Sequence, residues 1–242
     1  MMQAPHSLDQ YRTILTRSAS LGSVVIGRIE PDPLGSWLGR VNKLGRGEDW
    51  PLFEGRPMVG IAQLNVSQAP FVPMELDGIG FLTLFLGEKG GDLVVPDERP
   101  NGDGWLLRAY PSQTELIDVA PVELQGLRPR RLSWELISDL PDWEDIAMTA
   151  DGTAINALLD SRDYYEAIGG ASQGTKLGGW PDLIQGAISW RSATNVACPT
   201  TYALQVDSDE KVGLNLWDSG VIHFGLSVEE GRVVWAAESQ FM

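Results

Sequence analysis

The sequence predicts an α+β, mainly β protein: a roll-like fold of antiparallel sheets built from two degenerate repeated strand modules with a few flanking helices. The first observation is a repeated unit, made of a Trp-Pro pair, a strand ending in Gln-apolar-(Asn/Asp), and a second strand opened by Gly. The unit occurs at about residues 50–86 and again at about 180–226. The second observation is that strand-like runs outnumber helical patterns, and the short turns between them favour antiparallel pairing. Both modules fit in one domain covering residues 1–242.

The two copies of the unit share a few matching residues. Gln63 and Gln205 hold the same place in the first strand, and Gly80 and Gly220 open the second strand, where we expect them to serve backbone geometry. Two interpretations of the Gln pair stay open. The amides either face a shared cleft or satisfy backbone groups where strands diverge. The second is favoured, because a repeated residue in a repeated fold is usually architectural.

The amino-terminal third combines a helix, a strand and a loop. Ser7 begins a capping-box pattern, and the apolar residues that follow lie on one helical face: Leu8, Tyr11, Ile14 and Leu15. Residues 23–29 are rich in β-branched side chains and predict a buried strand. Residues 30–48 are interrupted by Gly and Pro, which indicates an irregular loop.

Strand patterns dominate the rest of the chain. They lie at residues 58–65, 80–86, 105–109, 115–119, 132–138, 201–207, 221–228 and 232–236. Turn-rich segments occupy residues 88–104 and 171–189. Short helices are expected at residues 141–150 and 153–168, the second capped by Asp151 or Thr153 and ended by a Gly-Gly pair.

The chain is strongly acidic, with 33 acidic and 18 basic residues and a formal charge of −15. This balance argues against nucleic acid and anionic membrane as partners, and it permits a basic protein or a cationic ligand. The lone Cys198 excludes an intramolecular disulfide and a thiolate-rich metal site, so a reducing cytoplasm is the simplest compartment. No signal-peptide pattern is visible, and no apolar run approaches the ~20 residues that span a bilayer.

An acidic helical insert is predicted at about residues 132–170, where nine acidic residues accompany one base, Arg162. Acids interleaved with large aromatic rings suit a basic protein partner, since charge steers association and rings anchor it. The candidate partner-binding residues are Asp139, Asp142, Trp143, Glu144, Asp145, Asp163, Tyr164 and Glu166. We expect Trp143 and Tyr164 to be exposed and Tyr165 to face inward. A solvated face whose rings all point inward is the open alternative.

Several segments resemble the YwqG-like family (domain of unknown function 1963). In the second half they are Lys176-Leu177-Gly178-Gly179-Trp180-Pro181, Leu204-Gln205-Val206-Asp207-Ser208-Asp209 and Trp217-Asp218-Ser219-Gly220-Val221-Ile222-His223-Phe224. In the first half, Trp50-Pro51 and Ile61-Ala62-Gln63-Leu64-Asn65-Val66-Ser67 resemble the corresponding elements. The Gly- and Pro-rich run usual before Trp-Pro is replaced here by residues 41–47. The resemblance implies a mainly β, roll-like fold, supplies no catalytic residue, and includes members encoded beside polymorphic toxins.

The sequence therefore favours a non-enzymatic, cytoplasmic immunity protein with no metal and no cofactor. Its expected partner is a cognate bacterial toxin of the basic nuclease type, whose substrate surface an acidic protein can cover. The alternative is a small-ligand binder or enzyme with a cleft between the two modules, using Gln63, Gln205, Asp218 and His223. No Ser or Cys nucleophile motif accompanies His223, which favours a structural histidine.

Overall fold

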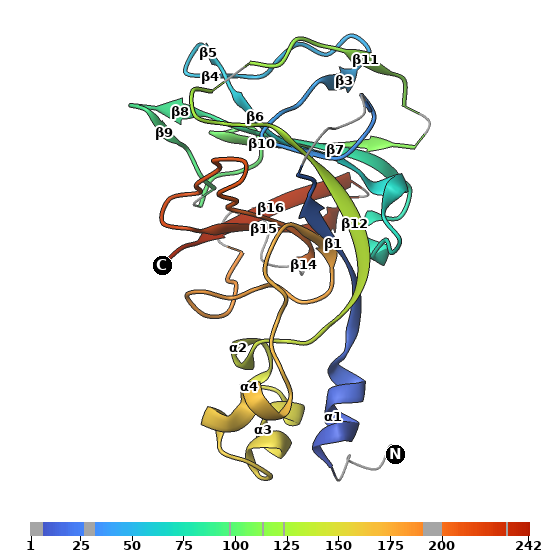
Figure 1. The fold of residues 1–242 in the computed structure, drawn as a ribbon, viewed down its shortest axis with the longest axis vertical. Helices are drawn as coiled ribbons and strands as arrows, with labels where there is room; N and C mark the ends of the chain where they lie inside the picture. The colour runs from blue at the N-terminus through green and yellow to red at the C-terminus, as the bar shows by residue number, and fades with distance from the viewer. Residues whose placement is uncertain are drawn as a thin grey trace.

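The computed structural model describes residues 7–26, 32–96, 98–112, 114–122, 124–190, 200–230 and 232–242. The protein is mainly β, with 40% strand and 14% helix, and its large antiparallel sheet is nearly closed. Figure 1 shows the curved sheet stacked above a small group of helices. The expected fold class is confirmed.

Ten strands form the large sheet, in the order β10-β7-β6-β2-β12-β1-β13-β14-β15-β16. Their bounds are β1 (Arg17–Val24), β2 (Trp37–Leu38), β6 (Val59–Asn65), β7 (Ile79–Leu86), β10 (Trp105–Pro111), β12 (Arg130–Asp139), β13 (Lys176–Gly178), β14 (Thr201–Asp207), β15 (Val221–Glu229) and β16 (Arg232–Gln240). Small hairpins and pairs add β3 (Lys43–Gly45) with β11 (Leu116–Asp118), β4 (Leu52–Phe53) with β5 (Arg56–Pro57), and β8 (Glu88–Lys89) with β9 (Asp92–Leu93).

The sheet consists of two equivalent halves that exchange their first strands. The first half contains β1, β2, β6, β7 and β10, and the second contains β12, β13, β14, β15 and β16 in the same roles. However, β1 pairs with β13 of the second half, and β12 pairs with β2 of the first. The strands β1 and β12 also pair with each other, with Ser23 opposite Ser133. That Ser pair marks the centre of a pseudo-two-fold relation.

Hydrogen bonds at the exchange repeat on both sides of this centre. Leu132 N donates to the Ser36 carbonyl at 2.8 Å, and Gly22 N donates to the Thr175 carbonyl at 2.9 Å. The two short strands β2 and β13 are therefore held on one side by their own half and on the other by the opposite half.

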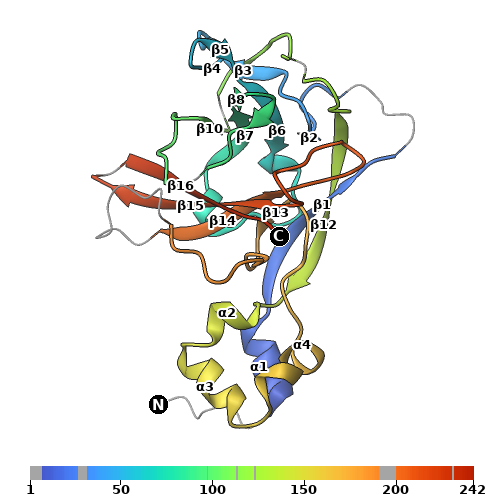
Figure 2. The same ribbon diagram turned by 90° about the vertical axis from the view of Figure 1, so that its left-hand side faces the viewer.

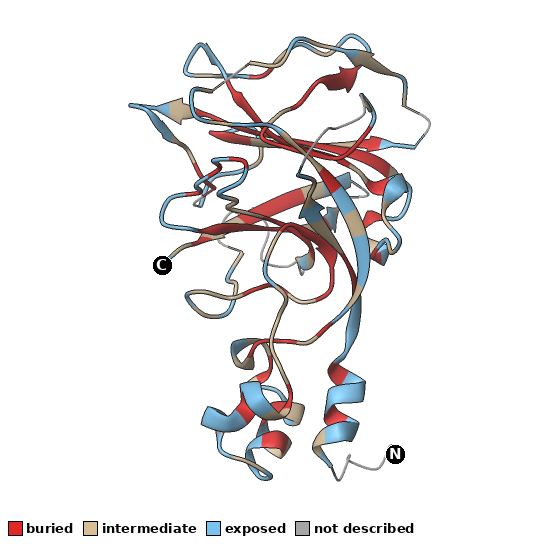
Figure 3. Cartoon of the chain, viewed as in Figure 1, coloured by how far each residue is buried: buried red, intermediate tan, exposed pale blue. Residues whose placement is uncertain are grey.

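One apolar core fills the space between the halves (Figure 3). The β7 strand is buried along almost its whole length, as a continuous apolar run predicts. Trp105 of β10 packs against Phe224 of β15 with ring centroids 5.9 Å apart. Because these side chains come from different halves, the main core is shared between them. A smaller cluster of Val41, Leu44, Met58 and Phe85 lies within the first half.

A helical lobe, defined here as residues 8–15 and 140–170, stands off one end of the sheet (Figures 1 and 2). It contains α1 (Leu8–Leu15), α2 (Trp143–Ile146), α3 (Ala150–Asn156), the 3₁₀ turn η3 (Ser161–Asp163) and α4 (Tyr164–Ala167). Two other 3₁₀ turns, η1 (Val66–Gln68) and η2 (Met74–Leu76), belong to the first half of the sheet. The lobe has a separate small core, formed by Tyr11, Leu15, Ile146, Ile155, Tyr164 and Ile168. The capping box at Ser7 is confirmed, while Ile14 is exposed.

Several predicted boundaries were wrong. The predicted strand at residues 23–29 begins where β1 ends, Ile26 is 74% exposed, and residues 27–29 lie outside the described part. The register with β12 fixes the strand from Arg17 to Val24, because both of its edges are paired there. The loops expected at 30–48 and 171–189 contain the short strands β2, β3 and β13.

The predicted helix at residues 153–168 is broken into α3, η3 and α4. Its cap is Thr149, whose hydroxyl accepts from Gly152 N, and not Asp151 or Thr153. Between α3 and α4, the Asp160 carboxylate accepts from Arg162 N at 3.0 Å and forms a local turn.

Candidate functional site

Gln63 of β6 is fully buried and bonded to backbone groups. Its Oε1 accepts from Asn42 N at 3.0 Å, and its Nε2 donates to the Gly35 and Pro33 carbonyls at 2.9 and 3.1 Å. A buried amide used in this way satisfies the backbone N–H and carbonyl groups of chain that crosses the sheet edge. It is therefore part of the scaffold.

Gln205 of β14 repeats this arrangement in the second half. Its Oε1 accepts from Asp182 N at 3.0 Å, and its Nε2 donates to the Gly174 carbonyl at 2.9 Å. Oε1 also accepts from Tyr202 Oη at 3.1 Å. The glutamine pair thus has the architectural role that the repeat favours.

The glycines of the repeat also serve the backbone, as expected. A Cβ on Gly80 would lie 2.7 Å from Ser112 Cα, and one on Gly220 would lie 2.5 Å from the Leu216 carbonyl oxygen. Both distances are too short for a side chain. Each glycine therefore admits a close approach by neighbouring chain.

The four residues of the alternative cleft do not surround a cleft. Gln63, Gln205 and His223 are buried with no exposed surface, and the space between the halves is filled by apolar side chains. Asp218 is exposed in the turn before β15. His223 Nε2 lies 2.9 Å from the Asp182 carbonyl, and burial lowers the pKa of this imidazole to about 4. The ring is neutral at pH 7, with its Nε2 proton held by a carbonyl.

Asp139 was expected on a partner-binding surface, but it is buried at the root of the helical lobe. Its carboxylate accepts a hydrogen bond from Lys176 Nζ at 2.9 Å. It also accepts hydrogen bonds from the backbone N–H groups of Ser172 and Trp180, both at 2.8 Å. Lys176 is also fully buried, and its Nζ donates to the Ser172 carbonyl. Burial lowers the pKa of Lys176, and the Asp139 charge opposes this change.

Asp142 is a second buried acid of the expected surface. Its carboxylate accepts from Ala171 N at 3.1 Å and from Leu183 N at 2.8 Å. Asp139 and Asp142 therefore fasten the chain that leaves the lobe to the chain that enters it. Buried carboxylates need such donors, which is why these two are unavailable to a partner.

Two further acids have strongly raised pKa values. Burial, with the neighbouring Asp142 charge, raises the pKa of Asp145 to about 7. The Oδ2 atom of Asp145 is buried and has no hydrogen-bond partner among the described residues. Burial raises the pKa of Asp182 to about 6, again with a contribution from Asp142. The root of the lobe is thus a buried, ionisable region without a described cavity beside it.

The two adjacent tyrosines have exchanged the places expected for them. Tyr164 is fully buried, and its hydroxyl donates to the Pro141 carbonyl at 2.9 Å. Tyr165 is 49% exposed, and its hydroxyl donates to Glu144 at 3.0 Å. Trp143 is half-buried, with its ring 5.3 Å from that of Tyr164. The helix break before α4 turns Tyr164 inward, which a continuous helix would not do.

The outer surface of the lobe keeps part of the predicted set. Glu144, Asp163 and Glu166 are exposed. Large apolar side chains are exposed on the same lobe, including Met148 at 97% and Leu158 at 49%. We name Trp143, Glu144, Met148, Leu158, Asp163, Tyr165 and Glu166 the lobe surface. No sequence pattern pointed to Met148, and Leu158, at helical spacing within residues 153–168, was expected on the apolar face of a continuous helix.

Within the described residues, no group of three or more His, Cys, Asp or Glu side chains is placed to hold a metal ion. No helix there is long and apolar enough to cross a membrane.

The family model for a domain of unknown function, DUF1963, matches residues 36–230. The chain belongs to the DUF1963 family. The match covers β2 to β15, including the part of the lobe inserted between β12 and β13, while α1, β1 and β16 lie outside it. No curated protein matches the chain. The hydrogen bonds of Gln63 and Gln205 explain what the repeated strands maintain in this chain.

Proposed function

We propose that this DUF1963 protein is a non-enzymatic immunity protein of the cytoplasm that binds and neutralises a cognate bacterial toxin. The partner in this proposal is a basic, nuclease-type toxin, held by the lobe surface. The observation that carries the proposal is the exposure of Met148, Leu158 and Tyr165 among the exposed carboxylates of one protruding lobe. Large apolar side chains in such a setting are typical of protein-binding surfaces.

Charge supports a basic partner. Glu144, Asp163 and Glu166 are exposed on the lobe, and the whole chain carries −15. Negative potential speeds the encounter with a positively charged surface and disfavours acidic competitors. Tyr165 and Trp143 supply rigid rings whose burial would slow dissociation. The resemblance to a family that includes members encoded beside toxins is consistent with this role.

The proposal differs from the sequence expectation in the residues that touch the partner. Asp139, Asp142 and Tyr164 hold the lobe together, so they act on binding only through the fold. Asp145 is half-buried, with its Oδ2 atom inaccessible to solvent, and belongs with them. The contact set is the lobe surface alone.

Affinity capture from native cells at low and moderate salt supplies the candidate partner, and binding of that purified protein provides the test. We expect a basic protein whose toxicity is suppressed by co-expression. The triple variant Glu144→Lys/Asp163→Lys/Glu166→Lys should slow association at least tenfold and flatten its salt dependence. Tyr165→Ala should speed dissociation about tenfold.

A matched control reverses three exposed acids outside the lobe, Asp77→Lys/Glu210→Lys/Glu230→Lys. Both triple variants change the net charge equally. Equal losses in the two variants would mean that only total charge matters, and unchanged binding in the lobe variant would place the interface elsewhere. Absence of a basic partner at either salt would refute the proposal.

A further inference from the structure

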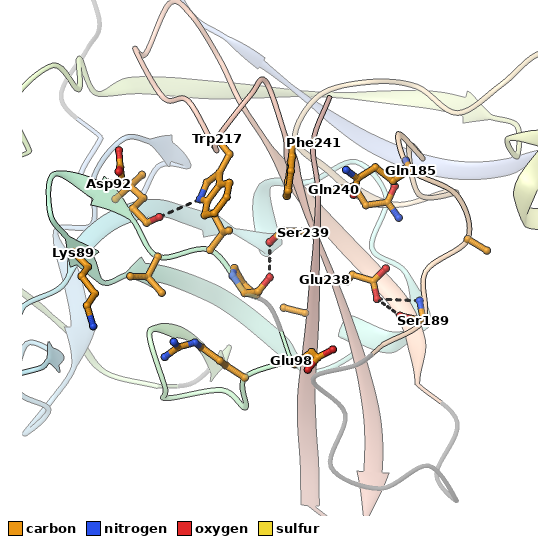
Figure 4. Close-up of a pocket in the computed structure, with 17 residues that line it drawn as sticks. Lys89, Asp92, Glu98, Gln185, Ser189, Trp217, Glu238, Ser239, Gln240 and Phe241 are labelled. Carbon is orange, nitrogen blue, oxygen red and sulfur yellow. Dashed lines mark hydrogen bonds between the residues drawn. The ribbon is translucent and has the colours of Figure 1, made fainter.

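A cavity of about 660 Å³ opens where the large sheet fails to close (Figure 4). One wall is the β8–β9 hairpin with the segment that follows it, and the other is the end of β16 with Trp217. Two hydrogen bonds join the walls: Ser239 Oγ donates to the Pro96 carbonyl at 2.7 Å, and Trp217 Nε1 donates to the Leu93 carbonyl at 3.3 Å. The volume is in the range of small-molecule sites.

Trp217 is the central feature of this region. Its side chain is 53% exposed, and it also lines a second hollow of about 410 Å³ together with Asp92, Asn215 and Asp218. The indole lies 5.3 Å from the Phe241 ring. An exposed indole shared by two adjoining hollows provides a stacking surface for whatever spans them.

The backbone at Trp217 is strained, with a φ of +63°. A bulky side chain rarely occupies this left-handed region, which costs on the order of 1 kcal/mol or more. The turn is held by Ser219 N, which donates to Asn215 Oδ1 at 3.1 Å, and by Met242 N, which donates to the Asp218 carbonyl at 3.2 Å. A strained, fixed turn that presents an exposed indole is typical of a binding site rather than of a packing role.

The charge of the lining selects the ligand. Carboxylates line both hollows, namely Asp92, Glu98, Asp218 and Glu238. Among the described residues of the lining, the cations are Lys89 and Arg99, and each pairs with an acid outside the lining, Glu54 at 2.8 Å and Asp103 at 3.2 Å. Within the described part of the chain, the Glu238 carboxylate accepts from the backbone N–H and the hydroxyl of Ser189, both neutral groups, and forms no ion pair. The lining therefore favours cations.

We propose that the two hollows and Trp217 bind an aliphatic polyamine, with its methylene chain on the indole and its ammonium groups at the carboxylates. Ammonium groups near an indole face gain cation–π attraction, and the methylenes gain apolar contact. An extended diamine or triamine matches two hollows joined by one ring. Lysine side chains of a peptide carry the same chemistry, so the test separates the two sources. This site is distinct from the lobe surface, and its test does not depend on whether the immunity proposal is correct.

The test is calorimetric titration of the full chain with spermidine. The informative variant is Trp217→Gly, because Gly adopts the positive φ without strain and the fold should be retained. We expect at least tenfold weaker binding in Trp217→Gly and about threefold to tenfold weaker binding in Asp218→Asn. The charge-matched control is Asp163→Asn on the lobe, which should leave the affinity unchanged. In the indole N–H spectrum, the Trp217 signal, identified by its loss in Trp217→Gly, should shift with spermidine.

Two outcomes would overturn the proposal. Equal weakening in Asp163→Asn and Asp218→Asn would show that spermidine merely condenses on an acidic protein. Binding by a neutral oligosaccharide but not by spermidine would assign the indole to another ligand class. A Lys-rich peptide that binds through Trp217 while spermidine does not would also overturn the small-molecule source.

Discussion

In the first half of the sheet, the residue opposite Gln63 on β2 is Trp37, whereas the residue opposite Gln205 on β13 is Lys176. One strand further, Thr83 pairs with Gln63 and His223 pairs with Gln205. In both halves the amide oxygen accepts from a backbone N–H that follows the short strand, and the amide nitrogen donates to the carbonyl of a glycine that precedes it, Gly35 or Gly174. The side chains around the two amides differ. The comparison teaches that duplication preserved the groups that satisfy the backbone and left the neighbouring core positions free to become ionisable.

The connections between the first two strands of each half differ as well. The connection from β1 to β2 covers residues 25–36, while that from β12 to β13 covers residues 140–175 and contains most of the helical lobe. Asp139 ends β12 at the start of this longer connection. It supplies the counter-charge that lets Lys176 occupy a buried position where the first half has an aromatic ring.

The largest effect is expected from removing that counter-charge. Asp139→Ala leaves the buried Lys176 ammonium unpaired and two backbone N–H groups without acceptors, which should cost about 3–5 kcal/mol in the free energy of unfolding. The control is Asp103→Ala, which breaks the Arg99–Asp103 pair, both of whose side chains are about half exposed; that change should cost under about 1 kcal/mol. Urea unfolding measures both. Similar losses would mean that the Lys176–Asp139 pair contributes no more than a surface pair.

The equivalence of the two amides can be tested next. Gln63→Ala and Gln205→Ala each leave a buried N–H and a buried carbonyl without their partner, so each should lower the unfolding free energy by about 2–4 kcal/mol. The two losses should agree within about 1 kcal/mol. If either substitution left the free energy of unfolding unchanged, the two amides would not contribute equally to stability despite their shared hydrogen-bond geometry.

His223 gives the second half a pH response that Thr83 cannot give the first. Its folded pKa, about 4, is below the ordinary value of about 6.5. The folded state therefore binds fewer protons, and the associated stability is present above pH 6.5 and is lost as the pH falls towards 4. His223→Thr should remove on the order of 2–3 kcal/mol of this acid-dependent loss. Unfolding curves at pH 7 and pH 4.5 give the slope, and parallel slopes for the variant and the parent would contradict the assignment.

The smallest effect concerns Asp145, and its sign is opposite. Its folded pKa of about 7 is above the ordinary value for Asp, so the stability it contributes is lost as the pH rises towards 7. Asp145→Asn should raise the melting temperature above that of the parent protein more at pH 8 than at pH 5. The difference between the two pH values should be equivalent to about 1 kcal/mol after solvent screening. Asp163→Asn, at an exposed position, should show no such pH difference.

The sequence predicted the sheet better than the lobe, and the reason is physical. A nearly continuous apolar run such as residues 80–86 favours a buried strand. The repeat in the sequence identified Gln63 and Gln205 as equivalent positions. The two-residue and three-residue strands β2 and β13 escaped, since partners distant in sequence define them. No local periodicity marks an element that short.

Burial of charge was the main error. In the sequence, Asp139 and Asp142 look like surface acids, because a carboxylate without hydrogen-bond donors avoids the interior. Their donors come from residues 171–183, which include Lys176 and are distant in sequence. A lysine inside the apolar Lys176–Gly178 strand was the one signal that could have indicated a buried acid. The cavity beside Trp217 had no signal, since the walls meet only after the sheet curls.

The exchange of first strands has a consequence for ancestry and assembly. A half-length chain with one strand pattern of this kind would leave an unpaired first strand and an unpaired second strand, and a second identical copy would complete both. The Ser23–Ser133 pair would then lie on a true two-fold axis, as in a closed symmetric dimer formed by swapping. The present chain has the arrangement of such a dimer joined end to end, with a helical insert and a buried lysine in only one half.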